Sequence, residues 1–552
     1  MPLSDDDWRD IQGLVRFGYG HLTAARFHLL TIADAAAARS WLANAPVTTA
    51  VKGHRPDVAL QIAFTYEGFQ RLGVASSTLA QFPYEFISGM TEASRARRLG
   101  DVAANDREWW LWGGPGKLPH VLMLLYAVTP DRLDQWEREL KNERWEAGFS
   151  TLTCLTTKDI GDIEPFGFND GISQPVVDWE RKKSARVHDT TAYTNLLALG
   201  EILLGYPNEY GKYTDRPLLD PRDDTEGILP SAEDVPGKKD LGRNGTYLVL
   251  RDLSQDAPVF WQFINDQAAS HREELDTVAA AMVGRLPLDI PIIPSDQNLV
   301  PNDKSKHAMP PGAPIVPLGG DAIPGVGPDP EDIQRNQFTF HNDVDGTACP
   351  HGAHIRRANP RNADLPEGTR GLFARLIRIL GFGRRHTHDD LIASTRFHRI
   401  LRRGREYVLE TADEGRGRVV QRGLRFICLN ANISRQFEFI QASWLANPKF
   451  EGLDEGDPLV ATRTPLSTGR PSDTFTRPRT SGLCRRFVAL PQFVHVRGGA
   501  YFFMPGISAL RHLARGQGKD GVVHASTEAG PLSRGEANWI DGSGMGVSRP
   551  PT

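Results

Sequence analysis

Residues 27–44, with the sequence FHLLTIADAAAARSWLAN, set the pattern on which the fold prediction depends. The first six of them, residues 27–32, are mostly bulky apolar or β-branched side chains and predict a strand. Residues 35–44 are rich in alanine and predict a helix, with Asp34 as its N-cap. A strand followed directly by a helix is the unit from which mixed α and β folds are built.

The same alternation continues toward the middle of the chain. Residues 58–65 (VALQIAFT) predict a second strand, and a short helix follows at 67–72. Residues 120–128 predict a third strand. A helix then begins after Thr129, a suitable N-cap, with Pro130 at its first position. Strands mixed with single helices in this order favour an α+β fold.

The second half of the chain shows the same texture. Residues 246–251 (TYLVLR) predict a strand, and a helix begins at Ala257. Residues 423–429 (GLRFICL) predict another strand, followed by a helix over residues 433–444. No sequence repeat of fixed period accompanies this alternation, so a solenoid is not expected.

Composition sets the class of protein. The chain has 552 residues, of which 40% are apolar and 24% charged, as in globular proteins. The chain is longer than a single hydrophobic core usually accommodates, so we predict two core domains with insertions. The 64 lysines and arginines nearly balance the 68 acidic residues, for a net charge of −4. This balance gives no reason to expect nucleic acid or an anionic membrane as the main partner.

The four cysteines are far apart in the sequence and predict no disulfide framework. No CxxC pair suggests zinc, and no CxxCH motif suggests covalent haem attachment. The N-terminal residues MPLSDDDWRD are acidic and do not resemble a secretory signal. No apolar stretch reaches the roughly 18 residues that a membrane span needs. We therefore predict a cytoplasmic protein without a transmembrane segment.

The first candidate for chemistry is GFNDG at residues 167–171, continued by ISQP at 172–175. Glycine permits positive φ angles and close backbone approach, so this segment can present Asp170 at the wall of a cavity. An ordinary Asp-Gly turn is the alternative interpretation.

A second candidate is CPHGAHIRRANPR at residues 349–361. A neutral imidazole is a good ligand for iron, zinc or copper. A zinc site formed by Cys349, His351 and His354 is one alternative, although it lacks a clear fourth ligand. The other alternative is one solvated and one packed histidine.

The third candidate is LRRGREY at residues 401–407. A guanidinium stays charged at any working pH and donates hydrogen bonds in a fixed fork, which suits a developing oxyanion. The alternative is a basic surface turn.

Taken together, these motifs resemble the dye-decolorising peroxidases. Residues 167–171 resemble the GxxDG signature of that family, and residues 349–361 its segment with the haem-ligating histidine. Residues 401–407 resemble the distal-arginine segment, and residues 423–426 the strand that lines the distal pocket. The resemblance covers most of residues 10–445 in the order that the family shows.

The resemblance implies an α+β fold of two ferredoxin-like modules, each an antiparallel sheet with packed helices, with haem held mainly by the C-terminal module. One departure from the family pattern is an inserted stretch at residues 365–397, which contains a helical pattern. It makes the separation in sequence between His354 and Arg402 longer than in fungal members. The predicted division is an N-terminal module with the GxxDG motif at 1–180, a connecting region at 181–240, a C-terminal haem-binding module at 241–510 with insertions at 286–335 and 365–397, and a tail at 511–552.

The resemblance also implies one non-covalent haem b per chain, with His354 as the axial ligand of the iron. Asp170 then matches the distal acid–base residue, and Arg402 the distal arginine, with Arg403 as the second choice. Leu424 and Phe426 then match the apolar residues over the haem face. Asp457 is then the carboxylate that steadies the axial imidazole.

The implied activity is the reduction of hydrogen peroxide with oxidation of dye-like or phenolic donors through a ferryl intermediate. Aspartate has an ordinary pKa near ~3.9, so Asp170 is a base at neutral pH and we expect activity well below neutrality. The alternatives are a haem carrier or sensor, or a protein that releases iron from haem, without significant peroxidase turnover.

Overall fold

The computed structural model describes residues 2–515 with several gaps, and these residues belong to one compact unit of the chain. The gaps are residues 52, 54, 159–162, 182–194, 272, 288–339, 341–342, 362–393, 414–416 and 466–468. The predicted insertions and the predicted tail lie largely in these gaps or after residue 515, outside the described residues.

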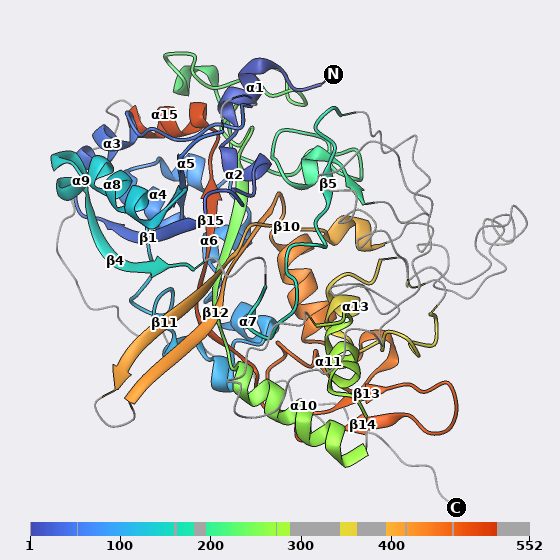
Figure 1. Ribbon diagram of the computed structural model, residues 1–552. Helices are drawn as coiled ribbons and strands as arrows, with labels where there is room; N and C mark the ends of the chain where they lie inside the picture. Colours follow the sequence, from blue (N-terminus) through green and yellow to red (C-terminus); the bar gives the residue numbers. More distant parts are fainter. Residues whose placement is uncertain are drawn as a thin grey trace, which may run out of the picture. The chain divides into compact units, whose positions relative to one another are not determined.

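The N-terminal part of the chain folds as an antiparallel sheet with helices packed on it (Figure 1). Its strands lie in the order β2-β3-β1-β4, and the chain order βαββαβ makes this a ferredoxin-like module. Asp34 and Thr129 cap its two main helices as predicted, because each side chain accepts a hydrogen bond from a backbone N–H of the first turn. The elements are β1 (Ala24–Ile32), α3 (Ala35–Leu42), β2 (Val58–Phe64), β3 (Val121–Ala127), α8 (Pro130–Leu140) and β4 (Phe149–Thr156).

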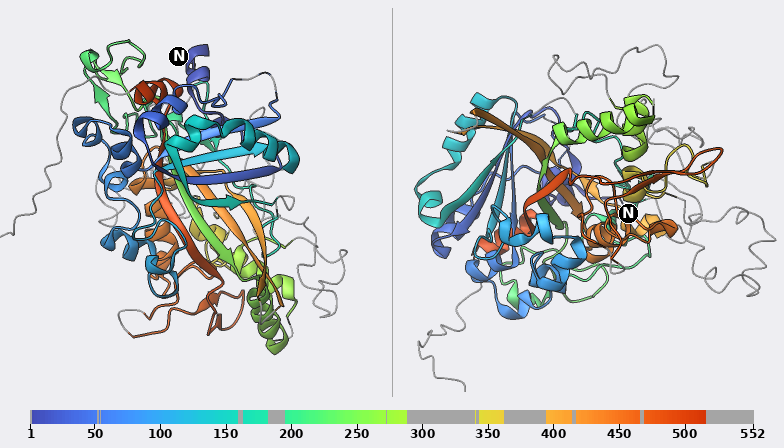
Figure 2. Two further views of the ribbon diagram at one scale, coloured as in Figure 1. Left: turned by 90° about the vertical axis from the view of Figure 1, so that its left-hand side faces the viewer. Right: turned by 90° about the horizontal axis from the view of Figure 1, so that it is seen from below.

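The later part of the chain repeats this arrangement. Its strands lie in the order β12-β9-β15, with β10 and β11 paired to the outer side of β12. In both views of Figure 2 these long strands run side by side, and α10 follows the end of β9. The elements are β9 (Thr246–Gln255), α10 (Ala257–His271), α11 (Leu275–Val283), β10 (Leu401–Arg402), β11 (Arg405–Asp413), β12 (Gly417–Asn430), the wide helical turns η7 (Ser434–Glu438) and η8 (Ile440–Leu445), and β15 (Val494–Met504).

The two modules share one continuous sheet of nine strands within the described residues. They join where β2 pairs with β15, and the register places Phe64 opposite Phe503. The predicted α+β fold with two ferredoxin-like modules is therefore confirmed, and the continuity of the sheet adds to it.

Shorter elements surround this sheet. Among the described residues, no helix is both long and apolar enough to span a membrane. The further helices are α1 (Asp5–Asp10), α2 (Gly13–Arg16), α4 (Tyr66–Leu72), α5 (Ser76–Leu79), α6 (Tyr84–Ser88), α7 (Ala93–Leu99), α9 (Glu143–Gly148), α13 (His354–Ala358) and α15 (Ile507–Arg515). The short 3-10 turns are Ala103–Asn105, Arg107–Trp109, Leu199–Glu201, Pro221–Asp223, Ser394–His398 and Phe450–Gly452. The short strands are β5 (Val176–Val177), β6 (Leu196–Leu197), β7 (Leu218–Leu219), β8 (Lys239–Asp240), β13 (Phe475–Arg477) and β14 (Arg485–Phe487).

A separate apolar cluster lies where α10 and α11 meet the loop that carries the GFNDG motif. Phe166 and Phe168 of this loop are buried and pack against Phe260 of α10. The Trp261 indole nitrogen donates a hydrogen bond to the carbonyl oxygen of Phe166 at 3.0 Å. These contacts fix the loop on the second module and place Asp170 at its inner end.

Candidate active site

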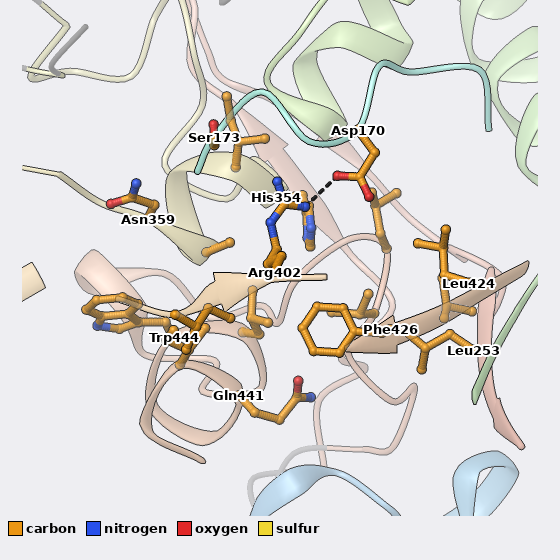
Figure 3. Close-up of a pocket in the computed structure, with 18 of the residues that line it drawn as sticks. Asp170, Ser173, Leu253, His354, Asn359, Arg402, Leu424, Phe426, Gln441 and Trp444 are labelled. Carbon is orange, nitrogen blue, oxygen red and sulfur yellow. Dashed lines mark hydrogen bonds and ion pairs between the residues drawn. The ribbon is translucent and has the colours of Figure 1, made fainter. Parts of the chain in front are cut away.

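A cavity of about 300 Å³ lies against one face of the second module's sheet (Figure 3). Alternate residues of a strand point to the same face, so β9, β12 and β15 each send every second side chain into the cavity. The loop with Asp170, helix α13 and the turn η8 line the rest. The sheet residues that line the cavity are Arg251, Leu253, Gln255, Leu424, Phe426, Val494 and Val496.

Asp170 reaches this cavity because two glycines bracket it. Gly167 and Gly171 have φ angles of +97° and +88°, in the left-handed region that favours glycine. One carboxylate oxygen of Asp170 accepts a hydrogen bond from the Gly171 amide at 2.7 Å. The same oxygen accepts one from Arg402 Nη1 at 2.5 Å (Figure 3). The motif is therefore a turn and also carries an ion-paired carboxylate to the cavity wall.

Arg402, on β10, lines the cavity, whereas Arg403 does not. The Arg403 guanidinium instead donates to the carbonyl oxygens of Leu14 and Val15 in the N-terminal part of the chain. Arg402, the last residue of β10, and Arg403, which directly follows the strand, thus point in different directions.

Opposing effects set the ionisation of Asp170. Burial raises the pKa of its carboxyl. The charge of Arg402 and the hydrogen bonds from Gly171 and Arg402 lower the pKa and outweigh burial, so the net pKa lies below the ordinary value. About a third of the Asp170 side chain, 32%, is accessible, and this surface faces the cavity. Asp170 is therefore an ionised base that a small molecule in the cavity can reach.

His354 is the first residue of α13, and it also lines the cavity. Its Nδ1 lies 2.9 Å from Oδ2 of Asp457, which is fully buried. Burial lowers the pKa of His354, but the charge and hydrogen bond of Asp457 outweigh it and raise the pKa above the ordinary value. An acceptor at Nδ1 favours the tautomer that leaves the Nε2 lone pair for a metal.

The other carboxylate oxygen of Asp457 fixes its own turn. It accepts hydrogen bonds from the amides of Leu459 and Val460, each at 2.9 Å. Burial raises the pKa of Asp457, and its contacts with His354 lower it to a net value below the ordinary one. Asp457 is thus a rigid, ionised partner for the imidazole.

The zinc interpretation finds no support in the described part of the chain. His351 pairs with Glu451 instead of approaching His354. Cys349 is buried, and burial raises the pKa of its thiol to about 12, which disfavours the thiolate that zinc requires. Within the described residues no three His, Cys, Asp or Glu side chains are grouped to hold a metal ion.

The residues of the cavity fit a haem. The imidazole of His354 with its buried carboxylate partner is a donor set that suits haem iron. Apolar side chains, among them Leu424, Phe426 and Trp444, suit the flat faces of a porphyrin. Arg361 and Arg399 also line the cavity and match the anionic groups at a porphyrin edge.

Sequence reasoning assigned no role to Gln174, although ISQP was part of the motif. Its side-chain amide pairs with the backbone of Arg402 in both directions: Nε2 donates to the Arg402 carbonyl at 3.2 Å, and Oε1 accepts from the Arg402 amide at 3.1 Å. Glu164 and Gln255 also line the cavity and were not predicted. No local sequence signal marks Gln174 and Gln255, because their partners lie far away in the chain.

Known proteins resemble this chain over nearly its whole length. No protein-family model matches it. "Peroxidase 2" of Mycetinis scorodonius is 27% identical over 533 residues, which cover 91% of this chain and 86% of that protein. A dye-decolorizing peroxidase of Exidia glandulosa is 26% identical over 552 residues, with 92% and 87% covered. The chain is a homologue of the dye-decolorising peroxidases.

The fold of this dye-decolorising peroxidase homologue matches solved structures as well. An ancestral D-type dye decolorizing peroxidase has a TM-score of 0.62 at 24% identity, with 93% of this chain and 99% of the other covered. A peroxidase of this type from Anabaena sp. has a TM-score of 0.61 at 20% identity, with 92% and 95% covered. These structures confirm the predicted α+β fold, while the sequence relatives support the predicted family.

Proposed function

We propose that this chain is a haem peroxidase that reduces hydrogen peroxide and oxidises small organic donors of the dye or phenol type. The observation that carries the proposal is that His354 and the Asp170–Arg402 ion pair line the same cavity. The names of the homologous peroxidases support it.

In this proposal the cavity would hold one non-covalent haem b, and His354 would bind its iron. Asp457 would keep the imidazole oriented, and Leu424 and Phe426 would pack against the haem and keep the space for peroxide narrow. When bound, the haem supplies a redox-active iron with one position open for peroxide.

Asp170 and Arg402 handle the peroxide itself. The ionised carboxylate of Asp170 accepts a proton from one oxygen of hydrogen peroxide and returns it to the oxygen that leaves as water. The Arg402 guanidinium stabilises the negative charge that develops as the O–O bond breaks. Over a full cycle, hydrogen peroxide takes up two electrons and two protons to give two water molecules, and two donor molecules lose one electron each.

Haem loading followed by peroxide addition tests this function. We expect a Soret band on loading, and a change of the absorption spectrum within seconds of adding peroxide. Arg402→Lys should slow that change, because the ammonium group of lysine cannot reproduce the planar fork of N–H donors that the guanidinium presents. Arg403→Lys is the matched control and should react like wild type.

The rival functions give a different result. A haem carrier, a haem sensor or an iron-release protein would show the Soret band but no rapid peroxide response. That outcome, or the absence of a Soret band, would contradict the proposed peroxidase.

A further inference from the structure

Glu164 lies at the base of the loop that carries Asp170, and its side chain also lines the cavity. We propose that Glu164 is a positioning residue that ties this loop to β9 and so holds Asp170 in place. The inference depends on the role of Asp170 in the proposed function.

The carboxylate of Glu164 organises its own loop. Oε1 accepts a hydrogen bond from the Phe168 amide and Oε2 one from the Phe166 amide, each at 3.0 Å. The backbone closes the same loop, since the Glu164 amide donates to the Phe168 carbonyl at 2.9 Å and the Gly167 amide to the Glu164 carbonyl at 2.8 Å. Asp170 follows two residues after Phe168, so its position depends on this turn.

The same carboxylate connects the loop to the sheet. Gln255, at the end of β9, donates from Nε2 to Oε2 of Glu164 at 2.7 Å. Phe166 and Phe168 anchor the opposite, apolar side of the loop against α10. Glu164 is therefore the polar tether of a loop whose other side is held by aromatic packing.

Glu164 and Asp170 line the same cavity, and the pKa values of their carboxyl groups are shifted in opposite directions. Burial raises the pKa of Glu164 to about 7, against its three hydrogen bonds, and the negative charge of Asp170 adds to the increase. The pKa of Asp170 is lowered. The other charged or titratable side chains that line the same cavity are Asp101, Arg251, Arg285, His354, Arg361, His398, Arg399 and Arg402.

The partner on β9 suits both protonation states of Glu164. Gln255 Nε2 donates to the ionised carboxylate, while Oε1 of the same amide is buried and has no hydrogen-bond partner among the described residues. A half-turn of this amide would present Oε1 to a protonated Glu164. The tether can therefore persist as the pH falls, which agrees with an acid-base residue that works below neutral pH.

Two variants of the haem-loaded chain test the tether. Glu164→Gln keeps the size of the side chain but cannot accept both backbone N–H groups, and Gln255→Met removes the donor on β9 and leaves Glu164 intact. Asp224→Asn is the matched control, because buried Asp224 accepts the amides of Ile228 and Leu229 in a loop whose residues do not line the cavity.

Hydrogen–deuterium exchange of the peptide over residues 163–172 is the first readout. We expect exchange to be at least about tenfold faster in both tether variants and unchanged in Asp224→Asn, which should instead exchange faster over residues 224–229. The peroxide reaction is the second readout, and we expect it to slow by roughly 10- to 100-fold in the tether variants, because a shift of about 1 Å in a reacting group costs that much. In an infrared titration, wild type should also show the band of a protonated carboxyl group that appears as the pH falls through about 7, and Glu164→Gln should lack this band.

Unchanged exchange at residues 163–172 in both tether variants would overturn the proposal. Faster exchange with a wild-type peroxide rate would overturn it too, because the loop would then not position Asp170 for reaction. If Glu164→Gln does not fold, Gln255→Met decides alone. Failure of the proposed function is distinct: wild type itself would not react with peroxide, while the exchange result would still report the tether.

Discussion

At the residue scale, the cavity separates two ionised carboxylates with different tasks. Asp170 is accessible from the cavity and pairs with Arg402, whereas Asp457 is fully buried and pairs with His354. Both have a pKa below the ordinary value, because a cation or imidazole and nearby N–H groups outweigh the effect of burial. One carboxylate can exchange protons with a small molecule, and the other can only orient its partner.

The lowered pKa of Asp170 predicts the pH dependence of the peroxide reaction. A carboxylate of lowered pKa stays ionised as the pH falls, so the base form is lost only below the ordinary aspartate value near ~3.9. We expect the second-order rate of the peroxide reaction, measured by stopped flow, to persist to about pH 4. A rate that vanishes below about pH 6, close to the histidine reference of ~6.5, would contradict the assignment.

Asp457→Asn separates the hydrogen bond that Asp457 makes with His354 from the two that it makes within its own turn. The amide oxygen can still accept from Leu459 and Val460, but the NH₂ group cannot accept from His354 Nδ1. We expect haem affinity to fall roughly 10- to 100-fold, as for other partners that orient a metal ligand. Competition with a haem-scavenging apoprotein measures this affinity, and an unchanged value would show that Asp457 does not support the imidazole.

Sequence reasoning identified the residues of the cavity that lie in local motifs. Asp170, His354 and Arg402 each stand in a short segment that resembles a family signature, and the structure places all three on one cavity. It also named Asp457, which contacts His354 103 residues away. Glu164 and Gln174 were not predicted, because nothing in the local sequence reveals that Glu164 pairs with the side chain of Gln255 or that Gln174 pairs with the backbone of Arg402.

At the element scale, side-chain amides align strands with loops. Gln174 pairs reciprocally with the backbone of Arg402, and so sets β10 against the loop that follows Asp170. Gln12 pairs in the same way with the backbone of Ile62 in the N-terminal module, and it lies outside the cavity lining. The two glutamines can therefore be compared: Gln174 holds a strand that lines the site, whereas Gln12 holds a strand that does not.

Replacing each glutamine with methionine tests that comparison. Both variants remove side-chain hydrogen bonds to the backbone, and each such bond contributes about 0.5–1.5 kcal/mol to the unfolding free energy. Urea unfolding should show similar losses for Gln174→Met and Gln12→Met. Only Gln174→Met should slow the peroxide reaction, and equal effects on that rate would contradict a local role of Gln174.

At the scale of the whole molecule, the two ferredoxin-like modules are joined by more than the β2–β15 pair. Trp112, from the N-terminal part, is buried and forms a backbone bridge with Gly498 of β15. The alternation of strands and helices predicted each module, because it depends on neighbours in sequence. The shared sheet could not be predicted, since its joint depends on a register between residues more than 400 positions apart.

Neighbouring glycines of β15 test this joint. A Cβ atom added at Gly498 would lie 2.5 Å from the Trp112 indole, whereas one at Gly499 would meet the flexible end of Met90 at 2.7 Å. We expect Gly498→Ala to lower the unfolding free energy by about 1–3 kcal/mol through overpacking, and Gly499→Ala to cost less. Thermal unfolding at matched pH measures both, and the reverse order would contradict the packing described.

The most direct test of the account is the absorption spectrum of the haem-loaded chain with each histidine of residues 349–361 replaced in turn. His354→Ala should lose the wild-type Soret band or fail to retain haem through gel filtration, because the iron loses its ligand. His351→Ala should match wild type, since His351 pairs with Glu451 instead. A wild-type spectrum for His354→Ala would contradict the central claim that this imidazole holds the iron.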